Sequence, residues 1–175
     1  MVADYVFRTV WRVAGTTAEV RDVLADGPSL PRWWPAVYLA VDPLREGDET
    51  GLGSEIAMLS RGLLPYTLSW TVRVVAPITD SGFSLTATGD LDGTGRWTFE
   101  QDGPEVVVSY DWRVSARKPL LRRLTWLLRP VFSANHRWAM ARGEESLRLE
   151  LRRRRAASEE ERRRIPPPPG RFPSL

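Results

Sequence analysis

The sequence contains no cysteine, one histidine (His136) and one lysine (Lys118) among its 175 residues. Without cysteine there is no disulfide and no thiolate nucleophile. The usual nitrogen and sulfur ligand sets for transition metals are also excluded, and we expect neither a metal nor a cofactor. No apolar run approaches the roughly 20 residues that span a bilayer. The first residues lack the apolar segment of a secretion signal, so we expect a cytoplasmic protein.

Aromatic side chains and arginine are what the sequence has in excess. Hydrophobic residues make up 42%, an ordinary value for a globular protein, but there are eight tryptophans. That number indicates either a core filled by large rings or an interior lined by them. The formal net charge is +3, and much of the arginine lies beyond residue 120. The basic character therefore belongs to the C-terminal region, and we expect no nucleic-acid partner.

Most of the chain up to residue 118 follows the period of two that is typical of strands. In YVFRTVWRV (5–13), aromatic and apolar residues alternate with polar ones, and YTLSWTVRVV (66–75) and EVVVSYDWRVSA (105–116) repeat the pattern. Turn signals such as Asp92-Gly93 separate the runs. Two short helical stretches, beginning near Thr16 or Thr17, lie between the first two strands. The pattern predicts six to seven strands in a largely antiparallel sheet.

After Pro119 the period changes to that of a helix. The segment up to Arg155 predicts one long helix, bent near Pro130, with a stripe through Phe132, His136, Ala139 or Met140, Gly143 and Leu147. Residues 156–175 contain charge blocks and four consecutive prolines, which predict a disordered tail. We therefore expect an α+β fold with one domain over 1–155, in which a curved sheet wraps around the long helix and a cavity lies between them.

Six short stretches carry a resemblance to a known superfamily. They are TTAEVRDVLAD after the first strand, WWPAV, GLGSEIAML, GDLDGTGRW, VSYDWRV and NHRWAMARGEESL. Their order and spacing over residues 3–153 resemble the START-like superfamily with the helix-grip fold, which includes the birch-pollen-allergen-like proteins. More closely, they resemble its bacterial polyketide cyclase/dehydrase and lipid-transport-type (SRPBCC) members. The resemblance implies a deep apolar pocket between sheet and long helix. Since such members include both aromatase/cyclases and lipid carriers, it does not settle function.

The inward positions of the strands and of the long helix supply the candidate pocket residues. Rings lining a pocket offer apolar area together with a few oriented hydroxyl and indole donors, and methionine gives an adaptable wall. The candidates are Trp34, Met58, Tyr66, Trp70, Phe83, Trp97, Tyr110, Trp112, Phe132, His136 and Met140. The alternative is that these rings simply fill a core. The inward face of SEIAMLS (54–60) cannot be assigned from the pattern.

His136 is the candidate catalytic residue. A histidine in an apolar cavity could orient a carbonyl or hydroxyl group of a ligand, or move a proton near neutral pH. It could equally be a structural histidine bonded to the sheet or to water, because no partner acid is identifiable. Asn135 could contact the ligand or face solvent. Gly143 has no side chain, which predicts a close approach of the long helix to a strand.

The corner PSLPRWWPAV (28–37) holds two adjacent tryptophans between prolines. In the resembling family this corner follows the first helix and closes one end of the pocket. Neighbouring positions on a short helix point about 100° apart. We therefore expect Trp34 to face the interior and Trp33 to pack outward against the rim or the first helix.

Three functions remain open. The first is binding or carriage of a hydrophobic small molecule, such as a lipid, a polyketide-like aromatic or an isoprenoid. The second is a polyketide cyclase/dehydratase in which His136 and a pocket tyrosine transfer protons, without metal or nucleotide cofactor. The third is a protein-interaction module. The basic amphipathic segment 119–130 could also contact a membrane surface transiently or act as a packed lid. The oligomeric state is left open.

Overall fold

The structure is a computed structural model that describes residues 5–116 and 125–172. These residues form seven strands: β1 (Tyr5–Ala14), β2 (Tyr38–Arg45), β3 (Glu55–Arg61), β4 (Thr67–Val74), β5 (Gly82–Gly89), β6 (Leu91–Asp102) and β7 (Glu105–Ala116). The same described part contains the helices α1 (Thr17–Leu24), η1 (Gly27–Ser29), α2 (Leu30–Trp33), α4 (Thr125–Arg155) and α5 (Glu159–Arg164).

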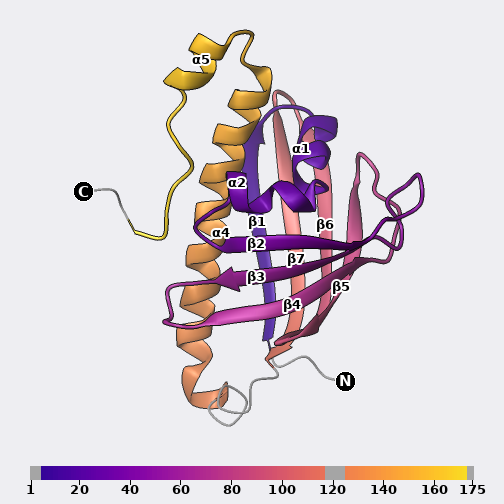
Figure 1. The fold of residues 1–175 in the computed structure, drawn as a ribbon, viewed down its shortest axis with the longest axis vertical. Helices are drawn as coiled ribbons and strands as arrows, with labels where there is room; N and C mark the ends of the chain where they lie inside the picture. The colour runs from indigo at the N-terminus through magenta and orange to yellow at the C-terminus, as the bar shows by residue number, and fades with distance from the viewer. Residues whose placement is uncertain (1–4, 117–124, 173–175) are drawn as a thin grey trace.

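All seven strands belong to one antiparallel sheet in the order β1-β7-β6-β5-β4-β3-β2. The two strands that are first in sequence lie at opposite edges, because α1, η1 and α2 carry the chain from one edge to the other. In Figure 1 the strands β2 to β4 cross in front of β1 and β7, and α4 runs along one side of the curved sheet. The prediction of a helix-grip fold with two short helices after β1 is confirmed.

Local sequence signals set the first helix. The side-chain oxygen of Thr16 accepts a hydrogen bond from the backbone N–H of Glu19, and the Glu19 carboxylate accepts one from the Thr16 backbone N–H. This reciprocal pair satisfies donors that the first turn leaves free. Val20, Val23 and Leu24 lie on the buried face of α1, as their helical spacing predicts. One helix, α4, runs through Pro130 from Thr125 to Arg155.

Glycine makes room for rings on the inner face of the sheet. Gly95 on β6 pairs with Trp112 on β7. A Cβ atom at Gly95 would lie 2.7 Å from the hydroxyl of Tyr110 and 2.9 Å from the side chain of Leu85. Since no other residue lacks Cβ, glycine here lets Tyr110 and Trp112 lie flat across the sheet, where their rings stack at 5.8 Å.

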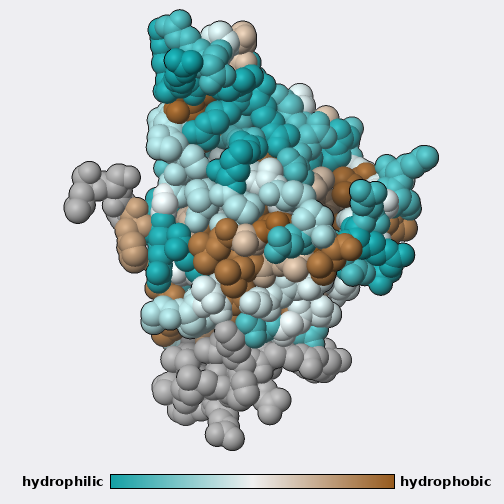
Figure 2. All heavy atoms as spheres, viewed as in Figure 1, coloured by the Kyte–Doolittle hydropathy of each residue, from teal (hydrophilic) through white to brown (hydrophobic). Residues whose placement is uncertain are grey.

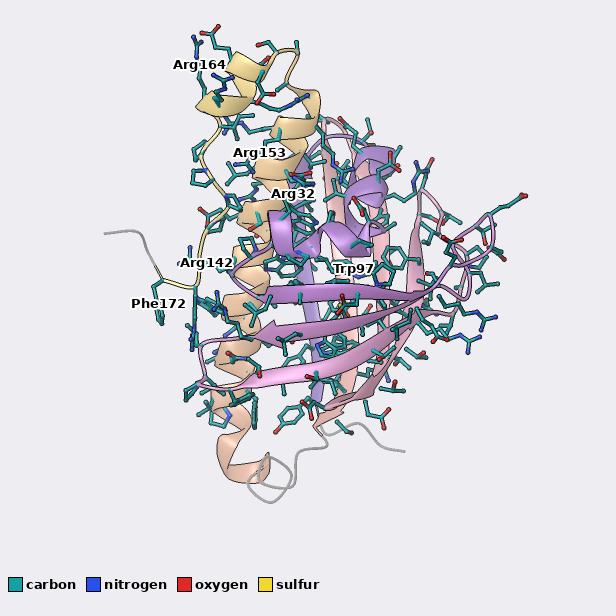
Figure 3. All side chains as sticks on the ribbon, in the orientation of Figure 1. Arg32, Trp97, Arg142, Arg153, Arg164 and Phe172 are labelled. Carbon is teal, nitrogen blue, oxygen red and sulfur yellow. The ribbon has the colours of Figure 1, made fainter. Side chains whose placement is uncertain are left out.

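A buried carboxylate joins the tryptophan corner to α4. Glu150 on α4 is 1% exposed and accepts two hydrogen bonds from Arg32 of α2, at 2.7 and 2.9 Å, and a third from Arg154 at 2.9 Å. Burial pushes the pKa of Glu150 upward, but the bonds from the two arginines outweigh it and leave the pKa below its usual value. Figure 3 shows Arg32 beside the upper half of α4.

The described residues that follow α4 contain a further short helix, α5, and contact the rest of the protein. Ser158 accepts a hydrogen bond from the backbone N–H of Glu161 and so caps α5, in which glutamates and arginines pair along the helix. Ile165 is buried. Farther on, the Arg171 guanidinium donates to the carbonyl oxygens of Leu63 (2.9 Å) and Leu64. These contacts explain why the residues after 155 follow α4 back toward the loop between β3 and β4 (Figure 1).

The face seen in Figure 2 carries apolar atoms across its middle, over the region of β2 and β3. Above them lies a hydrophilic area that includes α5 and the C-terminal end of α4. Leu39 and Leu44 of the edge strand β2 are exposed. Pro43 lies in the same strand, and a proline with charged neighbours reduces pairing of an edge strand with other chains.

Candidate ligand-binding cavity

Two adjoining cavities lie between the inner face of the sheet, α2 and α4. The first chamber has a volume of about 250 Å³ and lies between the corner after α1 and strands β2 to β6. The second chamber, of about 150 Å³, lies nearer Phe7 and the first half of α4. Figure 3 shows Trp97, a residue of the first chamber, in the space behind β2.

All eleven predicted pocket residues lie on the walls of these chambers. Met58, Phe83 and Trp97 line the first chamber. Tyr66, Trp112, Phe132 and His136 line the second. The four remaining residues, which line both chambers, are Trp34, Trp70, Tyr110 and Met140.

Several wall residues were not predicted. Tyr38 lines both chambers, and Arg45 and Arg61 line one each. Strand β3 turns Ile56, Met58 and Ser60 toward the chambers, as does Ser54 just before the strand. Its Glu55 lies 3.5 Å from Arg73 on the neighbouring strand. Residues along β3 alternate between its two faces, as in any strand. Because both faces mix polar and apolar residues, the pattern does not show which face points inward.

The two tryptophans of the corner have different positions. Trp34 lines both chambers, and its ring lies 5.7 Å from that of Trp11 and 5.3 Å from that of Tyr38. Trp33 lines neither chamber. It is 0% exposed, with its ring 5.5 Å from that of Trp34, so it lies away from the ligand space but is fully buried.

Gly143 allows Trp34 to pack against α4. A Cβ atom at Gly143 would lie 2.3 Å from the six-membered ring of Trp34. The sequence predicts that this glycine lets the helix approach a strand. In the structure the space at Gly143 holds the indole of Trp34, while the next residue, Glu144, accepts a hydrogen bond from the backbone N–H of Arg12 on β1.

His136 lies on the wall of the second chamber. Its ring stacks on Phe7 at 4.1 Å, and its Nε2 atom is 3.4 Å from the hydroxyl of Thr9. Burial lowers the pKa of His136 to about 4, because the apolar surroundings disfavour the charged form. Near neutral pH the imidazole is therefore uncharged and offers one donor and one acceptor nitrogen.

Two other polar groups of the second chamber, those of Ser60 and Asn135, already accept hydrogen bonds within the protein. The hydroxyl of Ser60 accepts a hydrogen bond from the Trp70 indole N–H at 2.9 Å. Asn135 faces the chamber, and its carbonyl oxygen accepts the backbone N–H of Leu63 at 2.7 Å. Burial, followed by the effect of Tyr5, raises the pKa of Tyr66 to about 12, so its hydroxyl is protonated near neutral pH.

The charges around the chambers are basic. Among the described residues, Arg45 lines the first chamber and Arg61 the second, while no aspartate or glutamate lines either. Over the same part of the chain, no group of three histidine, aspartate or glutamate side chains is placed to hold a metal ion. Glu144 of α4 accepts a hydrogen bond from the backbone N–H of Arg12 on β1.

Residues 119–124 of the predicted membrane-contact segment 119–130 lie outside the described residues, and 125–130 form the start of α4. No helix within 5–116 and 125–172 is both long and apolar enough to cross a bilayer.

Comparisons with known proteins agree with the fold. A family model described as polyketide cyclase / dehydrase and lipid transport matches residues 6–152. The Zhui aromatase/cyclase from Streptomyces sp. R1128 is 16% identical, with a TM-score of 0.68 over 89% of this chain and 98% of that one. A protein from Thermus thermophilus gives 14% identity and a TM-score of 0.67, over 87% of this chain and 100% of its own.

A third structure is a START superfamily protein from Mycobacterium smegmatis, with 15% identity and a TM-score of 0.57 over 78% of this chain and 98% of the other. No curated protein matches the chain by sequence. At these identities the solved structures show the shared fold, and the family model covers most of the sequence. The chain therefore belongs to the polyketide cyclase/dehydrase and lipid transport family.

Proposed function

We propose that this protein binds and carries a hydrophobic small molecule in the two chambers. The observation that carries the proposal is an unfilled interior walled by rings: Trp34, Trp70 and Tyr110 border both spaces, and Trp97 and Trp112 extend the walls. Concave apolar sites with a few polar groups are typical of small-molecule binding. A lipid, a polyketide-like aromatic or an isoprenoid fits this chemistry.

The ligand is expected to carry an oxygen function. The guanidinium of Arg61 and the protonated hydroxyl of Tyr66 are hydrogen-bond donors on the wall of the second chamber. An acceptor oxygen on an otherwise apolar ligand would meet these groups.

Filling the second chamber should weaken binding. Ala139 lines that chamber on α4, whereas Ala141, two positions on, is exposed. Ala139→Phe is expected to reduce the affinity for a hydrophobic dye such as Nile red by about tenfold, because one lost buried contact of about 1.4 kcal/mol corresponds to that factor. Fluorescence titration measures the change. Ala141→Phe is the matched control and should bind like the wild type.

Native mass spectrometry of protein purified from its own host would give a second readout, an added mass that organic solvent removes. Equal dye binding by the Ala139→Phe variant and the wild type, with no added mass in either, would count against the proposal.

A polyketide cyclase/dehydratase function is the second candidate. It is favoured by His136 and Tyr66 lying on one chamber, and by the aromatase/cyclase among the solved structures of the same fold. In that function the neutral imidazole would accept a proton and the tyrosine hydroxyl would donate one. The carrier function is preferred because Ser60 and Asn135 are already used within the protein.

Replacing His136 separates the two functions. If the protein cyclises a poly-β-ketone, His136→Phe should lower kcat by at least about 100-fold, the usual contribution of general acid–base catalysis. Wild-type turnover should then hold steady at neutral pH and fall as the pH approaches about 4, because protonation removes the acceptor nitrogen. Product formation by chromatography measures both. A carrier would show a changed affinity with no turnover in either protein.

A further inference from the structure

Five residues line both chambers and form the boundary between them: Trp34, Tyr38, Trp70, Tyr110 and Met140. Four of them are aromatic and are held by neighbouring rings or hydrogen bonds. Tyr110 stacks on Trp97 at 4.0 Å, and the Trp70 indole N–H donates to Ser60. Tyr110 and Trp70 therefore cannot move without breaking these contacts.

Met140 differs from the other four. It projects from α4 into the space between that helix and the sheet, and it is 6% exposed. Its side chain is unbranched and, within the described part of the chain, makes no hydrogen bond. Methionine has three rotatable bonds and changes rotamer at low cost, so it adapts to the shape of whatever lies beside it. Within the boundary, Met140 is therefore the residue that a ligand can displace.

We propose that Met140 determines how long a ligand the cavity accepts, by closing or opening the passage between the two chambers. With Met140 across the boundary, a short ligand occupies one chamber. A longer ligand must turn this side chain aside to occupy both. This inference rests on the proposed function, since it takes for granted that the chambers hold a hydrophobic ligand.

Met58 provides a matched control. It is the same residue type, is 5% exposed, and lines the first chamber but not the second. Truncating Met58 therefore enlarges one chamber by the same side-chain volume without joining it to the other. Any effect of a softer or larger core appears in both truncations, whereas an effect of the passage appears at Met140 alone.

The test measures displacement of Nile red by octanol and by dodecanol from the wild type and from Met140→Ala, Met140→Phe and Met58→Ala. Each further methylene that finds buried space raises affinity about fourfold. The ratio of dodecanol to octanol affinity is expected to rise about tenfold or more in Met140→Ala and to fall by a similar factor in Met140→Phe. Met58→Ala should leave it within about twofold of the wild type.

The inference is overturned if both Met140 variants keep the wild-type ratio, or if Met58→Ala shifts the ratio as much as Met140→Ala. If Met140→Ala shows no cooperative unfolding transition, the lowered ratio of Met140→Phe decides the question alone. Failure of the wild type to bind Nile red or either alcohol is a different result. It contradicts the proposed function itself, and this inference with it.

Discussion

Arg32→Ala is expected to lower the free energy of unfolding by about 3 kcal/mol near neutral pH. Glu150 is 1% exposed, and removal of Arg32 takes away two of the three side-chain hydrogen bonds that the structure gives its carboxylate. Removing a partner from a buried carboxylate raises the free energy of the folded state, because the group has lost its hydration and no other donor takes the partner's place. Urea denaturation followed by circular dichroism measures the loss.

The removal of the acid should be milder than the removal of the base. In Glu150→Leu the guanidinium of Arg32, whose side chain is 57% exposed, can turn to solvent and leaves no buried charge. The surface pair of Arg142 with Glu145 is the control, and Arg142→Ala should cost less than about 1 kcal/mol. Equal costs for Arg32→Ala and Arg142→Ala would contradict the importance given to the buried carboxylate.

The pH dependence of the Arg32 effect follows from the same network. The folded protein holds the pKa of Glu150 below its usual value, so the stabilisation is present above the unfolded pKa and is lost as the pH falls through the folded one. The difference between the wild type and Arg32→Ala should therefore shrink under acidic conditions, where the carboxyl group is protonated in both folded proteins.

Trp34→Ala is expected to lower the free energy of unfolding by about 3–5 kcal/mol, the range for truncating a large buried ring. Trp34 is 3% exposed and touches Trp11, Trp33 and Tyr38. For a chain of this length such a loss corresponds to a decrease in Tm of roughly 6–20 °C, measurable by calorimetry. Trp138, a partly buried tryptophan on α4, is the control and should cost less when truncated.

Ligand binding should respond to Trp34→Ala as well. Its removal takes away part of the boundary between the chambers, so affinity for small hydrophobic dyes should fall while larger ones are still accepted.

A variant that unfolds like the wild type, or that loses no more stability than Trp138→Ala, would show that the corner is not a structural part of the cavity wall.

Much of the site could be predicted because strand alternation is a local property. The period of two in β4 and β7 is enough to place Trp70, Tyr110 and Trp112 on the inner face of the sheet. The helical stripe of α4 likewise places Phe132 and His136 toward the second chamber. In these elements one face is distinctly aromatic or apolar, and burying that face permits only one orientation of the strand or helix relative to the core.

The features that escaped prediction depend on contacts between distant segments. Gly143 and Trp34 are far apart in the sequence, and neither reveals its partner in its own neighbourhood. The inner face of β3 was ambiguous because Ser54 and Ser60 share it with apolar residues. In the tail, the helix cap at Ser158 is a local signal, whereas the bonds from Arg171 to the loop after β3 are not.

The pairing of β1 with β7 has a consequence for the order of folding. Tyr5 lies opposite Val114, and Ala14 opposite Glu105, so the first of these seven strands to be synthesised pairs with the last. The other neighbours in the sheet are consecutive strands that pair soon after synthesis. The apolar face of β1, with Trp11, therefore stays uncovered until nearly the whole sheet exists. Long-range pairing of this kind slows folding and prolongs exposure of apolar surface to chaperones and to aggregation.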